Sequence, residues 1–448
     1  MGSAPLEFLG ELVALRTISA DPNRRPVLAY TANLLAKTLS DMGFSALCEE
    51  GYGPAPIVWA SRGPMGAKNS LIIYGHYDVQ PEGPRADWHS DPFQLVELDG
   101  LLYGRGVADD KGPIVALLAA IGNVRNWENL RLTVLLEGGE EVGSPEFGDF
   151  LRAHRDELAS HLAVLSADCG CPDENTPTII TCLRGIITGE LTLRTAHRDI
   201  HSGYGGCVPN AVQELALLCS KFHREDGSVA IPHFYDGIQK QIDREELAAV
   251  RSLAEREELA DILGVGCLRD IFSPVPPRAV HGFFPSLEWN GIWGGHTGEG
   301  SKTIIPAAAY AKFSLRTVPG QSARVLCAAL EDFAQRNCPP YGTVELHCAI
   351  HGPAYAIGGP SEAPELHRLL VLLENSLAQE FGHLPLRLRE GGSIGAVSDF
   401  KEILGLNSLL LGVVPTASHI HAPDENWPIQ SFHKTRCALS AFFNGLAR

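Results

Sequence analysis

The stretch SLIIYGHYD, from Ser70 to Asp78, joins a short apolar run to a turn that carries a histidine and an aspartate. Its first five residues predict a buried β-strand, because apolar runs of about four to eight residues are typical of strands covered on both faces. Elements of alternating type are expected after it: a helix at 111–124, a strand at 130–136, a helix at 145–154 and a strand at 162–165. This alternation predicts an α/β domain with a mainly parallel sheet.

The rest of the chain extends this domain and interrupts it once. Helices are expected at 6–15 and 27–42, and short strands at 45–48 and 57–60. Strands of alternating polarity at 186–195, 302–316 and 344–350, with helices at 209–222 and 322–336, predict a small α+β domain over 183–352. Residues 1–182 and 353–448, which include a buried strand at 407–413, are expected to form the catalytic, metal-binding domain. We therefore predict a mixed, largely parallel sheet with helices on both faces and an inserted α+β domain.

Composition restricts the partners of the protein. The chain has 448 residues, enough for two domains, and a formal net charge of -17, which argues against nucleic acids and anionic membranes as partners. A few local arginines can still hold an anionic substrate. No apolar run reaches the ~18 residues of a membrane span, and the first residues lack a secretory signal. Eleven scattered cysteines suit reduced thiols, so we expect a cytoplasmic protein.

Several turns carry side chains that can bind a metal ion or move a proton. They hold His76 and Asp78 after the first strand, Asp109 in the glycine-rich turn 103–112, Glu140 and Glu141 in 136–144, Asp168 after the strand at 162–165, and His421 in 418–426. Each turn alone also fits a solvated loop, a glycine-rich loop with an aspartate N-cap or an exposed acidic loop. In open α/β sheets, however, ligands bind beyond the carboxyl ends of the strands.

Taken together, these turns predict a metal centre. The adjacent carboxylates of Glu140 and Glu141 repel each other unless a cation is present or one is protonated, and a metal ligand beside a general base resolves that conflict. Asp109 is placed to bridge two cations. The set of two imidazoles and three carboxylates suits Zn²⁺, Mn²⁺ or Co²⁺ better than Ca²⁺ or Mg²⁺: His76, Asp109, Glu141, Asp168 and His421.

Three segments resemble the M20 family of metallopeptidases, and within it the carnosinase-like cytosolic nonspecific dipeptidases. They are GHYDVQP at 75–81, the stretch from GRG to DDKG at 104–112, and EEVGS at 140–144. WHSDPF at 88–93 and DGLLY at 99–103 fit the same pattern. The motifs occur in the order of the family and span nearly the whole chain.

The resemblance implies a role for each residue of the predicted centre. Asp78 would orient His76, Glu140 would be the general base, and the peptide after Asp109 would be cis. Two divalent ions, most simply Zn²⁺, are implied. Asp109 would bridge them, with His76 and Asp168 completing one site and Glu141 and His421 the other.

The inserted domain resembles the lid of this family, which also forms the homodimer. Within DIHSGYGG at 199–206, His201 matches the histidine that stabilises the oxyanion in the partner subunit's site. Thr303 and Arg316 match substrate-binding positions, with Arg316 placed to hold a C-terminal carboxylate, and Ser393 lies in a further substrate loop. The loop of His201 is one residue shorter than the family pattern, and Gly395 stands where relatives often have proline.

Two other functions remain open at this stage. A deacylase of N-acyl or N-carbamoyl amino acids would use the same metal centre, and a requirement for a free α-amine would distinguish a dipeptidase from it. A metal-binding scaffold without catalysis is disfavoured, because Asp78, Glu140 and all five ligands are present. Nucleotide binding is disfavoured as well, because neither a Rossmann glycine pattern nor a P-loop occurs. The charged segment 243–263 is expected to have a solvated face.

Overall fold

The computed structural model describes residues 5–236, 238, 244–251, 253, 256–273, 275–358 and 363–448. The chain divides into two compact units: the first comprises Met1–Thr181, Ile357–Leu388 and Ile394–Arg448, and the second comprises Cys182–Ala356 and Arg389–Ser393. The sequence predicted the junctions at 182/183 and 352/353, and the contacts place them at 181/182 and 356/357. The return of residues 389–393 to the second unit has no counterpart in the prediction.

The large sheet is mixed, as predicted. Its strand order is β1-β2-β6-β3-β7-β17-β8-β15, with β16 paired to β8. The parallel pairs β6-β3, β3-β7 and β7-β17 lie in the middle, and antiparallel pairs flank them. The strands are β1 (Ser45–Glu49), β2 (Ile57–Arg62), β3 (Asn69–His76), β6 (Leu130–Glu137), β7 (Ala163–Cys171), β8 (Thr178–Leu183), β15 (Tyr355–Ala356), β16 (Leu386–Glu390) and β17 (Ser408–Pro415).

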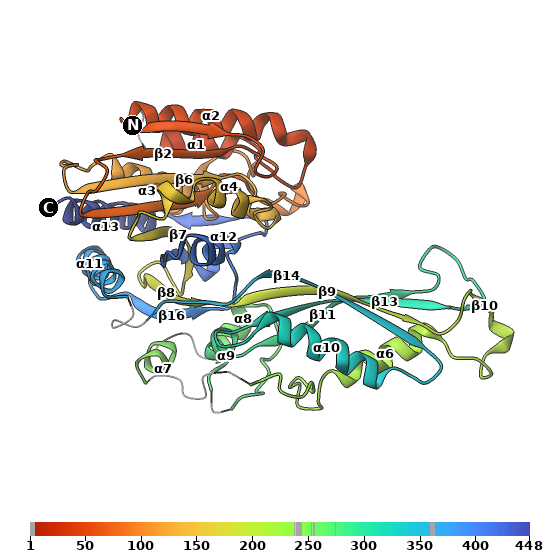
Figure 1. Cartoon of the computed structure of the whole chain (residues 1–448). Helices are drawn as coiled ribbons and strands as arrows, with labels where there is room; N and C mark the ends of the chain where they lie inside the picture. The colour runs from red at the N-terminus through yellow and green to blue at the C-terminus, as the bar shows by residue number, and fades with distance from the viewer. Residues whose placement is uncertain are drawn as a thin grey trace. The chain divides into compact units, whose positions relative to one another are not determined.

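Helices cover both faces of this sheet, which confirms the prediction (Figure 1). Because side chains alternate along a strand, Leu71 and Ile73 of β3 enter one core, and Ile72 and Tyr74 enter the other. The first core contains helices α1 (Pro5–Ala14), α2 (Arg25–Asp41), α3 (Lys111–Ile121), α11 (Pro364–Phe381) and α13 (Ile429–Leu446). The second contains α4 (Phe147–Ala153) and α12 (Gly395–Asp399).

The second unit is built on an antiparallel sheet with the order β11-β13-β9-β14. Its strands are β9 (Gly185–Arg194), β11 (Ser286–Gly294), β13 (Ala308–Thr317) and β14 (Thr343–Gly352). Helices α6 (Ala211–Lys221) and α10 (Ala323–Asn337) pack on one face, and the core contains Leu191, Phe313, Leu215 and Leu330 (Figure 1). Strand β11 was not predicted, because polar and apolar residues do not alternate regularly along it. Its pairing with β13 has a register shift between Trp289 and Gly291.

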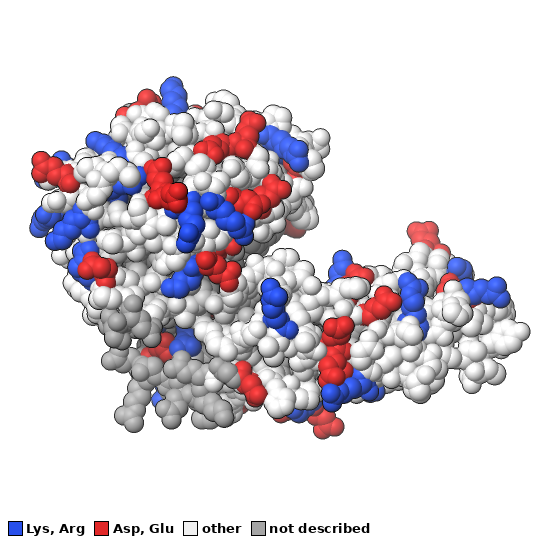
Figure 2. Space-filling model, viewed as in Figure 1, with Lys and Arg blue, Asp and Glu red and all other residues white. Residues whose placement is uncertain are grey.

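The charged segment forms two helices in its described part, α7 (Arg244–Arg251) and α8 (Arg256–Ile262), and Asp243 lies outside the described residues. Its charged face is not purely solvated, because Glu246 accepts hydrogen bonds from Arg389 at 3.0 and 3.1 Å. On the surface visible in Figure 2, acidic and basic side chains are interspersed. Among the helices of the described residues, none has the length and hydropathy that a membrane crossing requires.

Candidate active site

The predicted ligands of the first unit come from neighbouring parallel strands and the turns that follow them. His76 is the last residue of β3, and Glu140 and Glu141 lie in a 3₁₀ turn directly after β6. Asp168 was expected after a short strand, but β7 extends from Ala163 to Cys171 and includes it. Here Ala167 and Asp168 oppose a single residue of β17, and such a β-bulge changes the direction of a side chain. The apolar run alone did not reveal this extension.

These side chains form two groups that share Asp109. His76 Nε2 lies 2.9 Å from Asp109 Oδ1 and 3.7 Å from Asp168 Oδ2. His421 Nε2 lies 2.9 Å from Asp109 Oδ2 and 3.2 Å from Glu141 Oε2. In each group one ligand atom per residue lies within 4.8 Å of the others. The structure therefore brings all five predicted ligands together, with one oxygen of Asp109 in each group.

The geometry fits divalent metal ions. Two ligand atoms that both lie about 2.0 Å from a tetrahedral zinc ion are about 3.3 Å apart. The separations of 2.9, 3.7 and 3.2 Å are close to this value. Asp109 precedes α3, and its peptide bond to Asp110 is cis, as the resemblance implied.

The pKa values of the titratable groups around Asp109 are strongly shifted. Burial raises the pKa of Glu140 to about 8 and the pKa of Asp110 to about 8. Burial and then the neighbouring charges of Asp110 and Asp109 raise the pKa of Asp168 well above its usual value. Hydrogen bonds to Asp109 and Glu141 raise the pKa of His421 to about 10. A buried cluster of acids that holds protons in this way is the environment in which a cation binds by displacing them.

Asp78 links the predicted ligand His76 to the turn that carries Glu140 and Glu141. Its carboxylate accepts hydrogen bonds from the backbone N–H groups of Glu140 at 3.3 Å and Glu141 at 3.1 Å. The same carboxylate lies 3.3 Å from His76 Nδ1. Asp78 is completely buried, so one carboxylate fixes both the imidazole ring and the turn.

Two further contacts of this turn were not predicted. Gln80 donates from its side-chain amide to Glu141 Oε2 at 2.8 Å and from its backbone N–H to Glu141 Oε1 at 3.1 Å. Glu137 accepts hydrogen bonds from the hydroxyls of Tyr74 at 2.6 Å and Ser144 at 2.9 Å. Burial raises the pKa of Glu137 to about 7. Gln80 lies in the quoted segment 75–81, but a glutamine in a turn carries no specific signal for such a contact.

The predicted substrate residues lie in the second unit and form two pairs. His201, in β10 (Ile200–His201), pairs with Ile304 of β12 (Ile304–Ile305), and the next residue, Ser202, donates to the Thr303 carbonyl at 3.0 Å. Arg316 Nη1 donates to Ser393 Oγ at 2.8 Å. This contact explains why residues 389–393 belong to the second unit.

A further positive charge lies beside the Arg316–Ser393 pair. Arg184 donates from Nε to the Gly391 carbonyl at 2.8 Å, and its own carbonyl accepts a short hydrogen bond from Ser393. Burial and then the charge of Arg316 lower the pKa of Arg184 to about 10. A carboxylate bound here would therefore meet two guanidinium groups.

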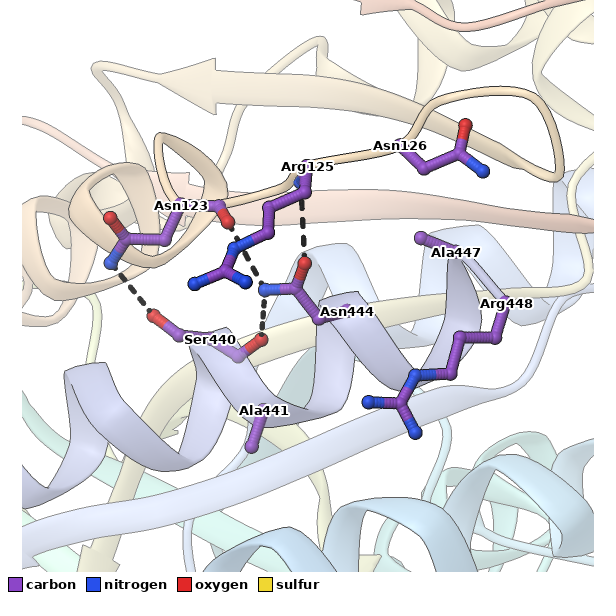
Figure 3. A pocket seen from close by; sticks show the side chains of 8 residues that line it. All are labelled: Asn123, Arg125, Asn126, Ser440, Ala441, Asn444, Ala447 and Arg448. Carbon is purple, nitrogen blue, oxygen red and sulfur yellow. Dashed lines mark hydrogen bonds between the residues drawn. The ribbon is translucent and has the colours of Figure 1, made fainter.

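A cavity of about 560 Å³ is lined by Asn123 and Arg125, which follow α3, and by residues of α13 such as Ser440 and Asn444 (Figure 3). Its polar groups bind one another: Asn123 donates to Ser440, and Asn444 donates to the Asn123 carbonyl, both at 3.1 Å. It contains none of the predicted site residues. The predicted site residues therefore lie in the two groups that share Asp109 and not at this cavity.

Comparison with known proteins identifies the family. The model of peptidase family M20/M25/M40 matches residues 72–444. The chain belongs to this family. It is thus a hydrolase of the M20 type, and the M20 resemblance seen in the sequence is confirmed.

Relatives match over almost the entire chain. The Cys-Gly metallodipeptidase dug1 of Schizosaccharomyces pombe is 27% identical over 95% of this chain and 92% of its own length. The human Beta-Ala-His dipeptidase is 26% identical over 98% of this chain and 86% of its own. Among solved structures, the M20 metallo-carboxypeptidase Sso-CP2 of Sulfolobus solfataricus has a TM-score of 0.84 at 26% identity, covering 99% of both chains. Human carnosine dipeptidase 1 has a TM-score of 0.76 at 24% identity, covering 99% of this chain and 96% of its own, which shows the shared fold.

Proposed function

We propose that this M20 protein is a dinuclear metal-dependent hydrolase that cleaves the amide bond of dipeptides or short peptides. The observation that carries the proposal is the pair of ligand groups that share Asp109, one with His76 and Asp168 and the other with Glu141 and His421. Relatives named as dipeptidases, which match most of the chain, support the substrate class.

Two cations held by these groups would supply Lewis acidity, which polarises a carbonyl and lowers the pKa of a water molecule. Glu140 would accept the proton of that water and return it to the leaving amine. Its position supports this role, because it neighbours Glu141 but belongs to neither ligand group. Asp78 would fix the positions of Glu140 and His76 relative to each other through the contacts described above.

We assign the second unit to substrate binding and to formation of a homodimer. Arg316, paired with Ser393, would hold the C-terminal carboxylate of the peptide. His201, with Thr303 beside it, would donate a hydrogen bond to the developing oxyanion in the partner subunit's site. The exposed position of His201 supports action on another chain.

Zn²⁺ is the ion we favour, with Mn²⁺ and Co²⁺ as alternatives, because imidazole and carboxylate ligands suit all three. The scattered cysteines support a cytoplasmic location. We propose neither a nucleic acid nor a membrane as a partner, because the net charge of -17 disfavours both.

The second candidate is an M20-type deacylase of N-acyl or N-carbamoyl amino acids, which would use the same centre. The test is hydrolysis of a panel containing Cys-Gly, β-Ala-His and other dipeptides, each paired with its N-acetylated form, by enzyme reconstituted with metal. Cleavage of the free dipeptides alone supports the proposal, and cleavage of the acylated forms alone replaces it with the deacylase. Tripeptides belong in the panel, because one structural relative is named a carboxypeptidase.

A further inference from the structure

Three loops of the proposed metal centre meet at a buried ion pair to which the sequence assigned no role. Arg105 Nη1 lies 2.6 Å from Glu425 Oε2. The two residues are 1% and 0% exposed, so neither charge is solvated. A buried ion pair is costly to desolvate, and further hydrogen bonds to both partners offset part of that cost.

The carboxylate of Glu425 organises the loop that ends at Asp109. It accepts hydrogen bonds from the backbone N–H groups of Gly106 at 3.0 Å, Ala108 at 2.9 Å and Asp109 at 3.2 Å. The backbone carbonyl of Glu425 also accepts the N–H of Gly104 at 3.1 Å. The loop therefore folds around one side chain, and the backbone of the shared ligand is bound to it directly.

The guanidinium of Arg105 extends this contact to two other loops. Its Nη2 donates to the carbonyls of Ala422 and Pro81, both at 3.3 Å. Ala422 directly follows the ligand His421, and Pro81 directly follows Gln80, which binds the second ligand group. The ring of Trp88 covers the guanidinium, with Cζ 5.3 Å from the ring centroid, and shields these bonds from water.

We propose that Arg105 and Glu425 are positioning residues that hold Asp109 and His421 at the separation needed for two metal ions. This inference rests on the proposed dinuclear centre. Residues that orient metal ligands in this way typically change metal affinity by about 10- to 100-fold when they are replaced. An ion pair that is only structural would change stability and leave metal affinity unaltered.

The test is Zn²⁺ titration of the full-length metal-free protein against a chromophoric chelator, with Glu425→Gln as the variant. Glutamine keeps the shape and one acceptor oxygen but removes the charge that binds Arg105. The matched control is Glu157→Gln, which breaks the pair between Arg131 Nη2 and Glu157 Oε1 at 2.7 Å. Arg131 lies near the start of β6, six residues before Glu137, which ends the strand on the side of the proposed site.

We expect Glu425→Gln to raise the Zn²⁺ dissociation constant of at least one site about 10- to 100-fold and Glu157→Gln to leave both constants unchanged. The rise in melting temperature on adding Zn²⁺ should shrink only in Glu425→Gln. If Glu425→Gln does not fold, Arg105→Lys decides, because lysine keeps the charge but loses the forked contacts to Ala422 and Pro81. If the variant that folds has Zn²⁺ dissociation constants within threefold of the wild-type values, the inference is overturned. Fewer than two Zn²⁺ ions on the wild type would overturn the dinuclear centre as well.

Discussion

Replacement of Glu140 by glutamine should separate catalysis from metal binding. The substitution keeps the backbone hydrogen bond from residue 140 to Asp78, so the turn retains its shape. It removes the only proton acceptor that the proposed mechanism uses. General-base catalysis contributes about 10²- to 10⁴-fold, which corresponds to roughly 2.7 to 5.4 kcal/mol of activation free energy. We expect kcat on a dipeptide such as Cys-Gly to fall by this factor, with KM changed much less.

The metal content distinguishes this variant from one that damages the centre. Glu140 belongs to neither ligand group, so Glu140→Gln should contain as much metal as the wild type by atomic emission. The control is Glu141→Gln, one residue further along, which removes a ligand at 3.2 Å from His421 and should lose metal and activity together. If Glu140→Gln keeps more than a tenth of the wild-type kcat, Glu140 is not the base. Loss of metal from Glu140→Gln would instead make it a ligand.

Three further perturbations test other parts of the structure. Burial lowers the pKa of His161 from 6.5 to about 4; the unfolded chain then binds the extra proton, so lowering the pH from 7 to 5 should remove about 2 kcal/mol of stability through this residue. Other buried acids also titrate in this range, so the measure is the difference between two proteins: the stability change from pH 7 to pH 5 in urea unfolding should be less favourable in the wild type than in His161→Gln by about 2 kcal/mol. A Cβ on Gly412 would lie 2.1 Å from the carbonyl oxygen of Gly170, so Gly412→Ala should destabilise the protein by about 1–3 kcal/mol or more. The control is Gly291→Ala, whose Cβ would meet open space and should leave the stability unchanged. Equal melting temperatures of the two variants would contradict this prediction. Arg316→Met should raise KM for dipeptides roughly 10- to 100-fold and abolish the preference for a dipeptide over its C-terminal amide. If the preference is preserved, the C-terminal carboxylate of the peptide binds elsewhere.

The sequence predicted which candidate ligands lie together because their positions obey a general rule. His76, Glu141 and Asp168 were each expected at the carboxyl end of an apolar strand, and neighbouring parallel strands bring those ends together. The side chains that support the ligands could not be predicted in this way. Glu425 is one acid among several in a polar turn, and its role depends on a loop that is 316 residues away from it at Asp109.

Other features escaped prediction because tertiary pairing overrides local pattern. Strand β7 continues through Asp168 because β17, a strand far along the chain, pairs with it. Strand β11 forms despite its irregular pattern because β13 supplies hydrogen bonds on both sides of the shift at Gly291. The short return of residues 389–393 to the second unit depends on Arg184 and Arg316, which both bind Ser393 and are distant from it in the sequence.

The place of β17 in the sheet has a consequence for biosynthesis. This strand lies between β7 and β8 but follows both of them far along the chain, so it leaves the ribosome long after they do. Until residue 415 has emerged, β7 and β8 lack their shared neighbour and leave exposed strand edges, the kind of surface that makes incomplete chains prone to aggregate. His421 follows only six residues later (421 minus 415). A nascent chain therefore completes its central sheet and receives its last proposed ligand at nearly the same moment, so early release of the chain would leave both unfinished.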